Sequence, residues 1–205
     1  MDGNGFTGLN PELARQNIIN FTERGIEAAE NYNNAIKFLF EQLYYTWCSP
    51  KAVEFTNIHE TEMYVSYKKI YLNICDICRN AVRAYNIVAS AHNARTIDYQ
   101  PREFTPGQNY MKLQENKDGI VGMNVNLVKN YILPEFDNKV RNALSLIDNL
   151  PQSIALYDDE NGQQHAFSTG ISKMVAEASD VITSIEKIID QSLAEEDNTI
   201  RLAKE

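Results

Sequence analysis

Three short clusters in the sequence carry side chains that could bind a metal ion or react. Cys75-Asp76-Ile77-Cys78 has the spacing of a redox pair or of half a zinc site. His59-Glu60-Thr61-Glu62 places a histidine one helical turn from a carboxylate, and Asp158-Asp159-Glu160-Asn161-Gly162 is rich in oxygen ligands of the kind calcium prefers. Each of these functions also requires partner residues at defined positions.

The cysteine pair lacks those partners. A reactive pair needs its first thiol at the start of a helix, where the positive helix end lowers the thiol pKa, but Cys75 and Cys78 fall in the middle of a long apolar-periodic run. A zinc site needs two more ligands, and Cys48 would lie about 40 Å away along a straight helix. We therefore expect three reduced cysteines and a pair that packs in a core.

The other two clusters are also incomplete. A di-iron bundle uses Glu-x-x-His on two helices, and none occurs among the three histidines of the chain. The Asp158–Gly162 stretch lacks the alternating ligands and the distal glutamate of a calcium loop. No phosphate loop, nucleophile elbow or metalloprotease motif is present. We expect a surface acid cluster at His59–Glu62, a solvated turn at 158–162, no cofactor, no metal and no catalytic residue.

Composition restricts the classes of partner. The 205-residue chain carries a formal charge of -9 and no basic stripe, which argues against nucleic acid and against anionic membrane surfaces. No window approaches the roughly 18 consecutive apolar residues of a membrane span. Residues 1–5 have neither a basic region nor an apolar run, so we expect a cytoplasmic protein that, if exported, uses no cleavable Sec signal.

The elements that hold these clusters are long helices. Apolar residues recur at steps of three and four in four runs, and few prolines or glycines interrupt them. The runs cover 11–47, 50–92, 121–150 and the stretch from about 168 onward. Ser49-Pro50 provides a cap and a first-turn proline for the second run, and Pro134 predicts a kink in the third.

This pattern predicts an all-α fold of two antiparallel helical hairpins packed as an elongated four-helix bundle. The expected parts are an N-terminal hairpin at 1–98, a linker at 99–119 and a C-terminal hairpin at 120–205. A small β-hairpin is expected between the third and fourth helices, where Asn161-Gly162 is flanked by Ile154 and Leu156 on one side and by Ala166 and Phe167 on the other.

The turn between the first two helices resembles the motif of a known family. Over residues 10 to 95 the chain is similar to the Trp-Xaa-Gly (WXG), early-secreted-antigen-like substrates of type VII secretion, in which the motif lies between two helices. Trp47 matches the tryptophan, and Ala52 and Phe55 match the small and aromatic residues that follow. Ser49 stands where glycine is usual, a departure that lowers the specificity of the match.

The resemblance implies a function. It implies a non-enzymatic, secreted substrate or adaptor that binds protein partners, namely the secretion ATPase and a co-secreted effector or WXG-like protein, with Trp47, Ser49, Ala52 and Phe55 forming the recognised turn. The family's export signal is a tyrosine followed four residues later by an acid, a spacing that Tyr99 and Glu103 share. Pro101 lies between them, so the two side chains are not expected on one helical face.

Two other readings stay open at this point. The family commonly forms dimers of hairpins, so this chain is either a tandem fusion that completes its own bundle or a homodimer. From a different class, the chain could be an intracellular helical scaffold or a four-helix domain that binds a small ligand between its helices. Finding the protein in the culture medium or only in the cell would separate secretion from the intracellular reading.

Overall fold

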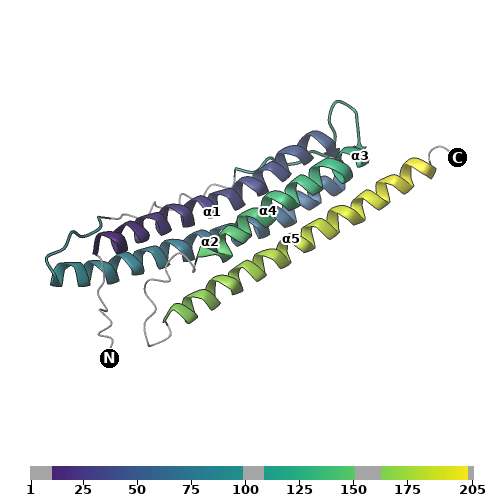
Figure 1. Cartoon of the computed structure of the whole chain (residues 1–205). Coiled ribbons are helices and arrows are strands. Elements are labelled where there is room, and N and C mark those ends of the chain that lie inside the picture. Colours follow the sequence, from purple (N-terminus) through teal and green to yellow (C-terminus); the bar gives the residue numbers. More distant parts are fainter. Residues whose placement is uncertain (1–10, 99–108, 151–162, 203–205) are drawn as a thin grey trace.

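A computed structural model describes residues 11–98, 109–150 and 163–202 of the chain, and these residues form an elongated four-helix bundle (Figure 1). The predicted all-α bundle is therefore confirmed. In order, its elements are α1 (Pro11–Thr46), β1 (Trp47–Cys48), α2 (Pro50–Ala91), β2 (Gly122–Met123), α3 (Val125–Leu127), the π-helical turn η1 (Val128–Ile132), α4 (Leu133–Asp148) and α5 (Gln163–Leu202).

Each helix packs beside helices that run in the opposite direction. The ammonium of Lys51, at the start of α2, pairs with Glu195 near the end of α5, and Lys69 pairs with Glu177 further along the same two helices. At the other end of α5, the Ser172 hydroxyl donates to Asp148 at the end of α4, at 2.9 Å. α1 packs against both α2 and α4, and α5 packs against the same two helices, so α5 lies across the bundle from α1 (Figure 1).

The apolar stripes predicted from the sequence meet in one main core that draws on all four long helices. The side chains that fill it are buried because each stripe is covered by its neighbours. The largest fully buried side chains in this core are Phe21, Tyr32, Ile36, Leu39, Phe40, Leu43, Trp47, Met63, Ile70 and Phe136.

Pro134 is accommodated by the π-helical turn that precedes it. Proline lacks a backbone N–H and its ring would clash with the carbonyl four residues earlier in a regular α-helix. In η1 the backbone widens, and the N–H of Leu133 donates to the carbonyl of Val128, five residues back. The third helical run thus continues from Val125 to Asp148 as α3, η1 and α4, as the unbroken phase of its stripe predicted.

α1 and α2 approach closely where Gly25 faces Ile74. A Cβ built on Gly25 would lie 2.8 Å from Cγ2 of Ile74, closer than two carbon atoms can pack. The single glycine of α1 therefore lets the two helices lie side by side without a gap.

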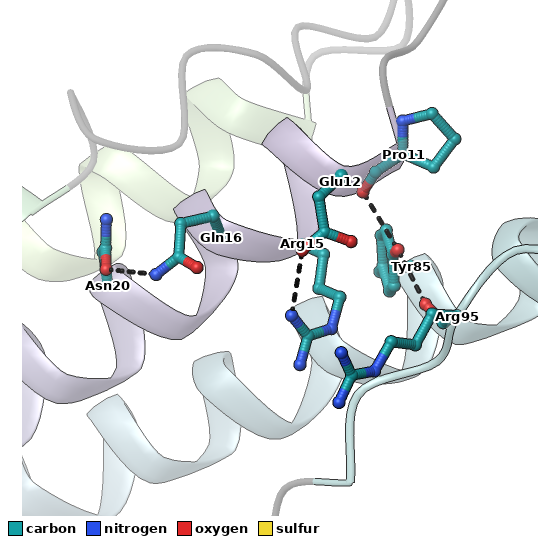
Figure 2. A network of polar contacts seen from close by, with 7 residues as sticks. All are labelled: Pro11, Glu12, Arg15, Gln16, Asn20, Tyr85 and Arg95. Atoms are coloured by element: carbon teal, nitrogen blue, oxygen red, sulfur yellow. Dashed lines mark hydrogen bonds and ion pairs between the residues drawn. The ribbon is translucent and has the colours of Figure 1, made fainter.

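The N-terminal part of α1 and the C-terminal part of α2 form a second, smaller core at the end remote from Trp47. It contains Ala14, Ile18, Val82, Tyr85, Ala89 and Ile97. The Tyr85 hydroxyl lies 3.0 Å from the Pro11 carbonyl oxygen and 2.9 Å from that of Arg95, so it can donate to either (Figure 2). The side-chain amide of Asn86 accepts a hydrogen bond from the N–H of Ile97 and donates one to the carbonyl of Ile97. These bonds fasten the chain after α2 back onto the helix pair.

The small β-sheet lies elsewhere than the predicted β-hairpin. β1 pairs antiparallel with β2, with Trp47 opposite Met123 and Cys48 opposite Gly122. The sheet therefore links the connection between α1 and α2 to the residues that precede α3. The predicted Asn161-Gly162 turn lies outside the described residues. Ala166 and Phe167, expected in its second strand, are helical, because α5 begins at Gln163 and runs on through Gly170. A glycine within a helix costs only about 1 kcal/mol, which the packing of so long a helix offsets.

Among the residues that the structure describes, none of the helices has the continuous hydrophobic length of a membrane span. The division of the chain into two hairpins and a linker stays a prediction.

Candidate functional site

Trp47 forms the corner between the two longest helices of the N-terminal half. α1 has 36 residues and α2 has 42, and only three residues separate them. The indole is 1 % exposed, and its ring centroid lies 5.4 Å from that of Phe55. The tryptophan therefore lies at the tight turn and closes that end of the core.

A short chain of hydrogen bonds joins the indole to the start of α2. The Trp47 Nε1–H donates to Oγ of Ser49 at 3.0 Å, and the same Oγ accepts from the backbone N–H of Ala52 at 3.1 Å. Ser49 is thus the N-cap of α2, with Pro50 at the first helical position, as its sequence predicted. A glycine at position 49 would offer the indole no acceptor.

The structure brings the four predicted motif residues together but buries all of them. Trp47, Ser49, Ala52 and Phe55 are between 0 and 4 % exposed. A partner protein that binds this end of the bundle in this conformation would therefore contact side chains other than these four. The motif residues stabilise the corner from inside the core.

A segment without a regular helix or strand, residues 109–116, packs beside these motif residues, and we call it the strap. The N–H of Ser49 donates to the carbonyl of Gln114 at 3.0 Å, and the N–H of Leu113 donates to Oγ1 of Thr56 at 3.2 Å. Tyr110 stacks on Phe40, with ring centroids 5.3 Å apart and planes within 6°. The strap thus packs against both α1 and α2 beside the corner.

Exposed apolar side chains gather just outside the corner. Tyr45, Ile120 and Val121 are 60, 67 and 59 % exposed, and we call these three residues the tip patch. They border a hollow of about 680 Å³ that also reaches Glu196 near the end of α5. The Lys117 ammonium lies 4.8 Å from the centroid of the Tyr45 ring, a cation–π contact that places one positive charge beside the patch.

Sequence reasoning missed both the strap and the tip patch. The strap has no helical or strand period that would reveal it, and its anchors lie far away in the sequence. The only local signal for the tip patch is Ile120-Val121, two adjacent apolar residues directly after Gly119. Tyr99 and Glu103, the predicted export signal, lie outside the described residues.

None of the protein families, curated proteins or solved structures compared with this chain matches it significantly.

The cysteines pack in the core, as predicted. All three are free thiols, and Cys75 and Cys78 lie in the middle of α2 with exposed fractions of 3 and 0 %. Burial raises the pKa of both thiols, that of Cys78 to about 12, so both stay protonated at neutral pH. A protonated, buried thiol is a poor nucleophile and a poor metal ligand.

The histidine cluster differs from the expected solvent-exposed acid cluster. His59 and Glu60 are each 8 % exposed, and the centroid of the His59 ring lies 5.1 Å from that of the Phe55 ring. Nδ1 of His59 lies 2.7 Å from Oε2 of Glu62, which is exposed. His59 and Glu60 turn inward because they share a helical face with Phe55 and Met63, which the sequence pattern alone assigns to the core. Across the described ranges, no three histidine, cysteine or acidic side chains are arranged to hold a metal ion.

Alkaline pH is expected to destabilise the fold. Burial raises the pKa of Tyr32, Tyr67 and Cys78 to about 12, from ordinary values of 10.0 for tyrosine and 9.0 for cysteine. The folded chain therefore keeps protons that the unfolded chain loses, so this stability is complete below about pH 9 and declines as the pH rises to about 12. We expect the urea midpoint to fall steadily between pH 9 and pH 11.

Cys78→Ala provides the control for that measurement. It removes one of the groups whose pKa is raised, so its midpoint should fall less steeply with pH than that of the parent, whatever its stability at pH 8. A parent midpoint that does not change between pH 8 and pH 11 would contradict the assignment of these groups.

Proposed function

We propose that this chain is a non-enzymatic substrate or adaptor of a type VII-like secretion system that binds proteins through its helical surfaces. One observation carries the proposal. A single tryptophan stands at a tight turn between two helices of 36 and 42 residues, and its indole bonds the serine cap of the second helix. This is the position that the motif tryptophan occupies in the WXG family that the N-terminal half resembles.

The surface that a partner would touch at this end is the tip patch. The motif side chains are buried, so they would act by holding the corner in shape. Tyr45 lies two residues before Trp47, and Ile120 and Val121 directly precede β2, the strand that pairs with β1. Aromatic side chains are enriched at the centre of protein interfaces, whereas charged side chains such as Lys117 are more common at the rim. We propose that the secretion ATPase or a co-secreted protein contacts the tip patch.

Export is the test of this proposal. The chain is expressed in a bacterium with a type VII system, with and without its membrane ATPase, and the protein is quantified in cells and culture medium. We expect export that requires the ATPase. The double variant Tyr45→Ser with Val121→Lys should reduce export about tenfold, because the loss of interface anchors costs about 1–2 kcal/mol of binding. Its melting temperature should stay close to that of the parent, since both side chains are exposed.

Ile87→Ser is the matched control. Ile87 is 65 % exposed on α2, near the end remote from Trp47, so this variant removes an equally exposed apolar side chain away from the corner. It should be exported like the parent. Protein retained in the cell in both strains would overturn the secretion proposal and favour an intracellular scaffold. If export required the ATPase but the Tyr45/Val121 double variant were exported like the parent, only the role of the tip patch would be overturned.

A further inference from the structure

A long groove runs between α2 and α5, along the half of α2 that begins at the corner. Its volume is about 640 Å³. The buried side chains of Ile70 on α2 and of Met174 and Ala178 on α5 form its floor. Ser66 and Ser184 are small, so the two helices leave space between them where larger side chains would have closed the bundle.

Apolar side chains remain uncovered along one wall of the groove. Ile58 and Val65, both of which line it, are 49 and 54 % exposed, and Leu72 continues the same line at 40 %. Neighbours in this line are seven residues apart, which is nearly two helical turns, so the three side chains lie in a row along α2. From Ile58 to Lys69 the lining extends about 17 Å, the length of three turns of a helix.

The rim of the groove is acidic. Among the described residues that line it, Glu62, Glu177 and Asp180 are acidic and Lys69 alone is basic, with its ammonium paired with Glu177 across the groove. The rim therefore has an excess of two negative charges, in a chain whose formal charge is -9. An occupant with positive charges beside an apolar stripe would be complementary to this rim.

We infer that the α2–α5 groove binds a basic, amphipathic helix of another protein, about three turns long. An apolar stripe at steps of three, four and seven residues would rest on Ile58 and Val65, and flanking lysines or arginines would meet Glu62 and Asp180. A groove open along its length suits a helix better than a small molecule, which proteins usually enclose. A second copy of the chain would bring another net charge of -9 to an acidic rim. This inference rests on the proposed function only in that the chain has protein partners.

The test uses two labelled 14-residue helical peptides with the same leucine stripe, one with lysines on the flanks and the other with glutamates. Binding to the full chain is measured by fluorescence anisotropy at low and at high salt. We expect the lysine peptide to bind at least tenfold more tightly than the glutamate peptide, and to weaken as salt screens the rim. The double variant Glu62→Lys with Asp180→Lys should reverse the preference.

Val65→Glu should weaken binding of the lysine peptide at least tenfold by placing a charge in the apolar wall, whereas Ile87→Glu on the same helix should leave it unchanged. Circular dichroism and melting curves confirm that both variants fold. Equal binding of the two peptides, or equal effects of the two variants, would overturn the inference. So would a dimer in light scattering that Val65→Glu dissociates, since a second copy would then be the occupant. None of these results would change the export measurement, so the groove inference and the secretion proposal can fail independently of each other.

Discussion

Replacing Trp47 by alanine is expected to lower the free energy of unfolding by about 3–5 kcal/mol, the range measured for large aromatic side chains removed from cores. The indole is 1 % exposed, packs on Phe55 and donates to Ser49. Its removal leaves a cavity at the corner. Oγ of Ser49, the N-cap of α2, also loses one of the two hydrogen bonds that it accepts. Urea unfolding followed by circular dichroism measures the change, because the variant lacks the only tryptophan of the chain.

Two variants make the origin of this loss testable. Trp47→Phe keeps an aromatic ring but removes the N–H donor, so it should cost clearly less than alanine. Tyr45→Ala removes an exposed aromatic ring two residues away and should change the stability by no more than about 0.5 kcal/mol. A loss below about 1 kcal/mol for Trp47→Ala would show that the corner does not support the bundle. This large effect is also why export is better tested with the tip patch than with Trp47, where unfolding would be confused with lost recognition.

Replacing Tyr110 by alanine is expected to release the strap and to cost about 3–5 kcal/mol as well, because Tyr110 is a buried aromatic residue. Its ring stacks on Phe40, and its hydroxyl donates to Oδ1 of Asn33 at 2.7 Å. The fluorescence of Trp47 reports on the release. Quenching by acrylamide should increase in the variant, because Gln114 of the strap is bonded directly to the backbone of Ser49.

Tyr110→Phe separates the two contributions of this residue. It keeps the stacking on Phe40 and loses the hydrogen bond to Asn33, so it should cost about 1 kcal/mol and leave the quenching of Trp47 unchanged. If Tyr110→Ala unfolded at the same urea concentration as the parent, the strap would be a passive connection.

The bundle could be predicted from the sequence because its signals are local. Apolar residues at helical spacing place the four helices, Ser49-Pro50 predicts the start of α2, and Pro134 predicts a disturbance that the structure resolves as a π-helical turn. Each of these depends on residues within one or two turns of one another. The same argument placed Cys75 and Cys78 in the core.

What the sequence did not predict depends on contacts between distant residues. The strap has no period, and Tyr110 and Leu113 acquire their role only from Asn33 and Thr56, which lie 77 and 57 positions away. The α2–α5 groove depends on which small side chains of two separate helices meet, such as Ser66 and Ala178, and a stripe pattern does not show this.

The alternation of helix direction has an electrostatic consequence. Every helix carries a dipole, positive at its N-terminus, and in this bundle each one lies beside helices whose dipoles point the opposite way. In the N-to-C direction, α1 and α5 run toward the corner, while α2 and the run from α3 to α4 run away from it. The axial dipoles therefore largely cancel. The field that an approaching molecule meets at a distance is therefore set by the surface carboxylates, and it attracts cations.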